Sequence, residues 1–219
     1  METNELIQHI AANSVPVRPL PAPWIRMALW LAISLPYVAA IVLVNPMRAG
    51  FAQAMSDQQF LIEQGAILAT VLAAAVAAFC STIPGYNRKI LFLPLVPLAV
   101  WLASLGEGCV RDWVELGADG LRLRADWGCL PSAALIGIIP AIVMVIMLRK
   151  GAPLVPRVTI ALGALAVAAL GNFGLRLFHV GDASIMVLLW HFGSVAVLAV
   201  LAATIGRQVF HWRHAGAGW

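Results

Sequence analysis

Two cysteines in the middle of the chain, Cys109 and Cys129, carry the side chains best suited to redox chemistry. Each lies at the end of an apolar stretch, and both ends adjoin the same polar segment, so we expect the two thiols on one side of the molecule. A disulfide requires Cα atoms about 4.4–6.8 Å apart, which neighbouring helix ends can provide. A structural staple, a redox switch and two free thiols all fit the sequence. Cys80, inside another apolar stretch, is most simply a small buried residue.

A second set of candidates consists of ionisable side chains within or beside apolar stretches. Arg176, His179 and Asp182 lie close together in the sequence and could form a charge network with Glu63. His191 is expected near the middle of the last apolar stretch. An ionisable residue at that depth of a membrane is a candidate functional site, although a neutral histidine bonded to a neighbouring helix fits as well. The cluster around Arg176 is either a structural ion pair or a sensor for a ligand or metal.

Neither a cofactor nor an enzymatic activity is predicted. The histidines and acidic residues lack the spacing of a metal site, and His191 has no second histidine at matching depth to complete a haem site. The sequence contains no Ser-His-Asp order, no phosphate-binding glycine loop and no metalloprotease motif. We therefore expect a protein without catalytic residues, metal or cofactor.

Most of these residues lie in or beside six apolar stretches, each close to the roughly 20 residues of a membrane-spanning helix. They cover residues 27–44, 61–83, 90–106, 129–148, 158–178 and 183–205. Charged residues make up 11% of the chain, against about 25% in soluble domains. Because backbone groups in lipid must be bonded within their own segment, the stretches are predicted to be helices. We expect an all-α polytopic membrane protein, a bundle of six transmembrane helices.

Small residues and prolines predict finer features of two of these helices. A stripe of small residues at a spacing of four in the second helix is expected to be a packing surface. It consists of Gly65, Ala69, Ala73 and Ala77. Pro94 and Pro97 are expected to break the third helix locally. Residues 107–128 are expected to form the longest outer segment.

The distribution of basic residues predicts the orientation. If the N-terminus is cytoplasmic, the inner segments contain Arg88–Lys89, Arg149–Lys150 and most other basic residues, whereas the acidic residues lie mainly in outer segments. The positive-inside rule then places both termini in the cytoplasm. The net charge of +4 follows from this topology, so we expect the lipid bilayer as surroundings and no direct nucleic-acid partner. The chain divides into a cytoplasmic leader (1–23), a transmembrane domain (24–206) and a cytoplasmic tail (207–219).

The leader has two parts. Thr3 or Asn4 is expected to cap a short helix that ends near residues 13–14. Its apolar face consists of Leu6, Ile7 and Ile10. The prolines that follow predict an extended lead into the membrane. The helix is too short to be stable alone. Its apolar face is therefore either accidental or a docking surface that folds into a groove of a partner.

Several short strings along the chain form a recognisable series. They are Glu5-Leu6-Ile7, Pro16-Val17-Arg18-Pro19-Leu20, Trp127-Gly128-Cys129, Leu148-Arg149-Lys150-Gly151-Ala152-Pro153-Leu154 with Pro156, Phe178-His179, Asp182-Ala183-Ser184 and Trp190. In this order, on a chain with six spans, they resemble the NrsF family of bacterial inner-membrane anti-sigma factors. The resemblance extends over nearly the whole chain.

The resemblance implies a function. Such proteins hold an extracytoplasmic-function sigma factor inactive at the membrane and release it under envelope, oxidative or heavy-metal stress. The leader would bind the sigma factor, with Leu6, Ile7 and Ile10 in an apolar groove and Val17 with Arg18 setting the register. The periplasmic cysteines would be the sensor.

One departure from the family concerns the cysteines. Many members have a second periplasmic cysteine in the last outer turn, where this chain has His179-Val180-Gly181-Asp182. Cys109 either replaces that cysteine as the partner of Cys129 or is unrelated to it.

A different class of function also fits the residues. A small transporter or redox carrier could use a polar pathway along Glu63, Asn172, Arg176 and His191. It predicts that substitution of His191 abolishes activity and that loss of the leader hardly matters. A structural membrane subunit is a third hypothesis. None of the three predicts an oligomeric state.

Overall fold

All the regular elements in the described part of the chain are helices. The computed structural model describes residues 3–12, 20–46, 48, 50–117, 129–153 and 155–178. Its elements are α1 (Thr3–Ala12), α2 (Pro23–Val44), α3 (Phe51–Ala54), α4 (Gln58–Cys80), the 3-10 helix η1 (Arg88–Phe92), α5 (Leu95–Leu116), α6 (Cys129–Arg149) and α7 (Pro156–Phe178). The predicted all-α class is therefore confirmed for these residues.

Five helices are long and apolar enough to cross a membrane: α2, α4, α5 together with η1, α6 and α7. They correspond to the first five predicted spans. Many of their large apolar side chains are exposed, among them Leu29 and Ile33 on α2 and Ile142 and Ile146 on α6. A lipid environment explains such an apolar exterior, since soluble monomers rarely expose large apolar patches. The sixth predicted span, 183–205, lies outside the described residues.

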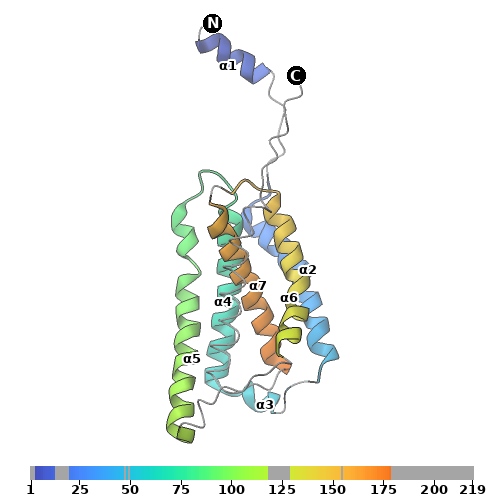
Figure 1. The fold of residues 1–219 in the computed structure, drawn as a ribbon, viewed down its shortest axis with the longest axis vertical. Coiled ribbons are helices and arrows are strands. Elements are labelled where there is room, and N and C mark those ends of the chain that lie inside the picture. Colours follow the sequence, from blue (N-terminus) through green and yellow to red (C-terminus); the bar gives the residue numbers. More distant parts are fainter. Residues whose placement is uncertain are drawn as a thin grey trace.

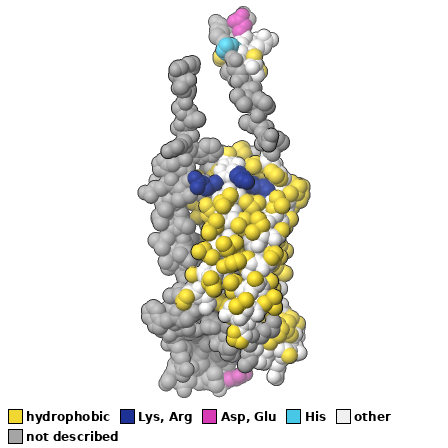
Figure 2. Space-filling model, turned by 90° about the vertical axis from the view of Figure 1, so that its right-hand side faces the viewer, with side chains coloured by type: hydrophobic (Ala, Val, Ile, Leu, Met, Phe, Trp, Pro, Cys, Tyr) yellow, Lys and Arg dark blue, Asp and Glu magenta, His cyan; other side chains and the backbone are white. Residues whose placement is uncertain are grey.

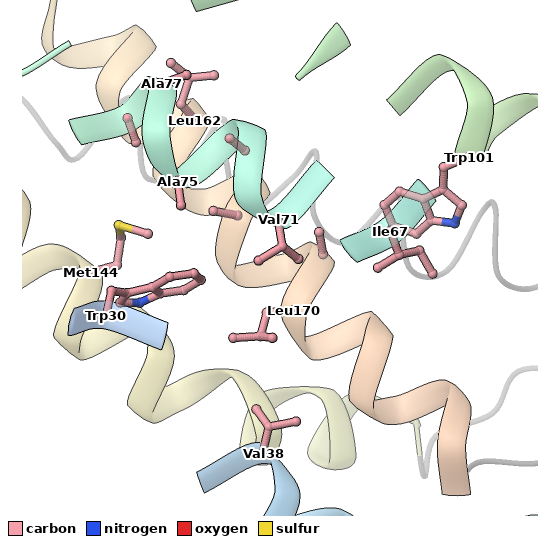
Figure 3. Close-up of a cluster of buried hydrophobic side chains, with 14 of the residues drawn as sticks. Trp30, Val38, Ile67, Val71, Ala75, Ala77, Trp101, Met144, Leu162 and Leu170 are labelled. Atoms are coloured by element: carbon pink, nitrogen blue, oxygen red, sulfur yellow. The ribbon is translucent and has the colours of Figure 1, made fainter. Parts of the chain in front are cut away.

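Helices α4 and α7 form the centre of the bundle (Figure 1). They pack against each other most extensively, with α5 on α4, α6 on α7, and α2 mainly against α6 and α4. Small buried residues, such as Ala74 and Ala78 on α4 and Ala166 on α7, allow the helix backbones to approach closely. Figure 3 shows larger side chains around this contact, with Trp30 beside Met144.

The predicted packing stripe on α4 is wrong for most of its residues. Ala77 is buried, but Gly65 and Ala69 are exposed and Ala73 is half-buried. The buried face of α4 instead runs through Ala66, Thr70, Ala74 and their neighbours, one position further along the helix. The stripe and the packing face are adjacent, and both are rich in small residues, so spacing alone did not distinguish them.

The third predicted span begins as expected and ends later. The expected break lies between Phe92, the last residue of η1, and Leu95, the first of α5, and Pro94 precedes α5 directly. The helix then continues past residue 106 to Leu116, so the outer segment expected from 107 starts only at Gly117. An Arg111–Glu107 ion pair of 3.7 Å supports the added turns. Gly117, with φ 62° and ψ −143°, ends the helix in a positive-φ conformation that favours glycine.

Candidate functional site

The N-terminal helix is the first candidate site, and it forms where the sequence predicts it. Figure 1 shows α1 apart from the bundle. Leu6 and Ile7 are 46% and 58% exposed. A helix of ten residues (Thr3–Ala12) is only marginally stable in water unless its apolar face packs against another surface. Such a face is suited to the apolar groove of a partner protein.

Three other residues assigned to the leader site are not placed by the structure. The backbone of Ile10 belongs to α1, but its side chain is outside the described part, and Val17 and Arg18 lie in the segment 13–19, which is not described. Their predicted roles in binding stay predictions.

A buried arginine in the first turn of α2, directly after the leader, bonds to other parts of the bundle. We call the end of the bundle at which α2 begins the leader end. There Arg26, only 3% exposed, donates from Nη1 to Thr82 Oγ1 at 2.8 Å and from Nη2 to the Met147 carbonyl at 2.5 Å. Its guanidinium also lies 4.6 Å from the centre of the Phe79 ring. Arg26 therefore connects the first turn of α2 to α4, to the turn after α4 and to α6.

Thr82 is bonded to three segments: to Arg26 on α2, to the end of α4 and to the turn between α6 and α7. Its hydroxyl donates to the Phe79 carbonyl at 2.7 Å, and its carbonyl accepts from the Ala152 amide at 3.0 Å. Gly151 packs so closely that a Cβ there would lie 2.4 Å from Thr82 Cβ. The α6–α7 turn is thus held against the end of α4. Beside it, a hydrogen bond with the Cys80 thiol raises the pKa of Tyr86.

The buried role of Arg26 was not predicted, because in the sequence it is one of the basic residues of the inner segments. The available signal was its isolation: α2 contains no other charged residue, and Arg26 lies one turn inside an apolar helix. A charge in that position is usually bonded within the protein.

Removing the Arg26 contacts is expected to destabilise the bundle. Arg26→Met should lower the free energy of unfolding by about 3 kcal/mol, because it removes two hydrogen bonds from a charged donor. Denaturant unfolding of the purified protein in detergent measures this loss. Arg157→Met, which removes an exposed cation at the same end, should change the value by less than about 0.5 kcal/mol. Equal losses in the two variants would contradict the structural role of Arg26.

A buried ion pair lies toward the opposite end of the bundle. Arg176 Nη2 on α7 and Glu63 Oε2 on α4 are 2.7 Å apart, and their side chains are 13% and 6% exposed. Both Arg176 and Arg48 approach the ring of Phe60, with guanidinium-to-centroid distances of 5.8 and 5.6 Å. The pair therefore links the two central helices inside the bundle.

The structure unites only part of the polar cluster expected from the sequence. Glu63 and Arg176 are brought together, whereas His179, Asp182 and His191 lie outside the described residues. Two further polar residues were not anticipated at this site, Arg48 beside Phe60 and the buried Gln64 next to Glu63 on α4. Within the described ranges, no group of three or more His, Cys, Asp or Glu side chains could hold a metal ion.

The two cysteines proposed as sensor belong to helices that do not pack as neighbours. Cys109 is half-buried on α5, and Cys129 is the first residue of α6, its side chain outside the described part. We expected these consecutive helices to pack together, but α5 packs on α4, and α6 packs on α7 and α2. Consecutive order did not predict contact, because α4 and α7 lie between them (Figure 1). The disulfide stays a prediction.

Exposed cations gather at the leader end. They are Arg88, Lys89, Arg149, Lys150 and Arg157. Figure 2 shows the Lys and Arg side chains of one face in a single band near this end, above a largely hydrophobic surface. The charge pattern therefore distinguishes the two ends of the bundle.

Comparison with known families decides the class of this protein. The sequence profile of NrsF, negative regulator of sigma F, matches residues 10–212. The chain belongs to the NrsF family. Its partner is therefore a sigma factor, and the family is one of regulators rather than enzymes. Leu6 and Ile7 precede the matched range, whereas Val17 and Arg18 lie within it. No curated protein and no solved structure matches the chain.

Proposed function

We propose that this protein is a membrane-bound anti-sigma factor that holds an extracytoplasmic-function sigma factor through its leader, residues 1–23. Membership of a family of negative regulators of a sigma factor supports the class of function. The observation that carries the assignment to the leader is the exposed apolar face of α1, with Leu6 and Ile7. Such a face binds by insertion into an apolar groove.

The bundle is proposed to span the bacterial inner membrane with the leader end in the cytoplasm. Five helices of sufficient length and apolarity support the insertion. The cations at the leader end, which include Arg88, Lys89 and Arg149, support the orientation, because basic residues are retained on the cytoplasmic side. The leader would then meet the sigma factor directly.

Release of the sigma factor is proposed to follow envelope, oxidative or heavy-metal stress sensed on the periplasmic side, with Cys109 and Cys129 as the responsive thiols. Helix α4 offers a route between the two sides. It holds Glu63 of the buried ion pair near one end, and Thr82, the contact of Arg26, follows its other end. A displacement of α4 would therefore reach the base of the leader. Such a switch requires two bundle states that differ in thiol state.

Capture of the sigma factor by the full-length protein tests this function. The protein in nanodiscs is immobilised, and binding of the sigma factor encoded nearest its gene is compared with that of a chain lacking residues 3–12. We expect saturable binding that the deletion abolishes. Equal binding of the sigma factor to both chains would refute the leader as the binding segment. Binding to neither chain would show that this sigma factor is not the partner of this protein.

A further inference from the structure

An open apolar groove runs along the outer face of α4. It has a volume of about 880 Å³ and lies between α5 and the first turns of α2. Its floor is formed by Gly65, Ala69 and Ala73, and its walls include Met27 and Leu93. A Cβ added at Gly65 would meet no atom within 4 Å. The small residues of α4 thus leave room beside the bundle that no described side chain fills.

The dimensions of the groove suit a hydrocarbon chain. Its lining on α4 extends from Ile62 to Val76, a length of about 21 Å at 1.5 Å per residue. One leaflet contributes only about 15 Å to the hydrocarbon core, so a lipid chain from one leaflet fits along it.

Basic side chains lie beyond the leader end of the groove. Leu93, which lines it, directly follows η1, and η1 begins with the exposed residues Arg88 and Lys89. With a rise of about 2 Å per residue in a 3-10 helix, Lys89 lies about 8 Å beyond Leu93. The sequence contains no acidic residue between Glu63 and Glu107. This end of the groove is therefore complementary to a negatively charged headgroup.

We propose that the groove binds an anionic phospholipid of the cytoplasmic leaflet, with an acyl chain along α4 and the headgroup on Arg88 and Lys89. Basic pockets at the cytoplasmic ends of membrane helices bind acidic headgroups in this way. The proposal rests on the orientation given above. A lipid held there would contact α2, α4 and the start of α5 together, and two of these helices, α2 and α4, are joined by Arg26 directly after the leader.

Lipid retention by the full-length protein tests the proposal. The protein is purified in detergent, equilibrated with phosphatidylglycerol or phosphatidylcholine, and examined by native mass spectrometry. We expect preferential retention of one phosphatidylglycerol. Arg88→Gln with Lys89→Gln should reduce that preference roughly tenfold or more, at about 1 kcal/mol for each basic residue. Ala69→Leu with Ala73→Leu, which fills the groove, should reduce retention of both lipids.

Two matched control variants distinguish binding in the groove from a general attraction between the protein's positive charge and anionic lipid. Arg149→Gln with Lys150→Gln removes two exposed cations away from the groove, and Ala39→Leu with Ala40→Leu enlarges an exposed surface of α2. Both should retain phosphatidylglycerol as the unmodified protein does. Equal retention of the two lipids, or an equal loss in the Arg149 variant, would overturn the proposal. If the unmodified protein is a dimer and the groove-filling variant is a monomer with unchanged lipid retention, the groove binds a second copy instead.

Failure of this proposal is distinguishable from failure of the anti-sigma function. The same preparations are assayed for capture of the sigma factor by the leader. Loss of the lipid preference with capture retained would remove only the lipid site. The Arg88 and Lys89 substitutions are on the surface, so they test the headgroup contact even if the groove-filling variant does not fold.

Discussion

A protein with Leu6→Asp and Ile7→Asp is expected to bind its sigma factor more than 100-fold more weakly than the unmodified protein. Both side chains are largely exposed on α1, and burial of each in a partner groove would contribute about 1.5–3 kcal/mol. Their joint loss amounts to roughly 3–6 kcal/mol, where each 1.4 kcal/mol is tenfold in affinity. Surface plasmon resonance with the full-length protein in nanodiscs measures the change.

The matched control carries the same added charge on the other side of α1. Gln8→Asp with Ala12→Asp places two carboxylates roughly opposite the apolar face, given about 100° of rotation per residue. We expect its affinity within about threefold of the original. If both double variants lose affinity equally, the effect comes from charge rather than from the apolar face, and the groove-docking mode is wrong.

Loss of the carboxylate of Glu63 is expected to produce the largest loss of stability. Glu63→Ala leaves the guanidinium of Arg176 buried without its carboxylate, and breaking a buried pair from one side costs about 3–5 kcal/mol. The exposed pair of Glu107 and Arg111 provides a control within the same chain, with side chains 70% and 49% exposed. Glu107→Ala should cost less than about 1 kcal/mol. Denaturant unfolding in detergent measures both.

A double variant distinguishes an ion pair from a packing effect. Glu63→Leu with Arg176→Met replaces both charges with apolar side chains of similar size, so it should recover most of the stability lost in Glu63→Ala. A double variant as unstable as the single one would show that the cost comes from shape, and the ion pair would then have no special role in joining α4 to α7.

The ion pair and the Arg26 contacts have a common physical consequence. Each places a charged group inside an apolar bundle, where the group must be bonded because water cannot replace the bond. One joins α4 to α7, and the other joins α2 to the end of α4. A movement of α4 must therefore either break one of these two sets of contacts, at a large cost in free energy, or move the bonded helix with it. This favours discrete bundle states over gradual deformation.

Local features of the chain were predicted well because they depend on neighbours in sequence. The apolar stretches around 27–44 and 129–148 match α2 and α6 within a few residues, since any helix in lipid must satisfy its own backbone bonds. The leader helix followed from its apolar spacing, and the break near Pro94 followed from the missing amide of proline. The end of α5 at Gly117 was missed because polar residues continue a helix as well as apolar ones do.

The helical class, the five described spans, the short leader helix and the concentration of basic residues at one end can all be predicted from the sequence. Each depends on hydropathy, local hydrogen bonding or the count of charges along the chain. Which helices touch becomes clear only from the three-dimensional packing. It separated α5, with Cys109, from α6, turned the stripe through Ala69 outward, and buried Arg26 against Thr82. Such contacts join residues far apart in sequence, and the side-chain shapes that select among alternative packings leave no periodic pattern in the sequence.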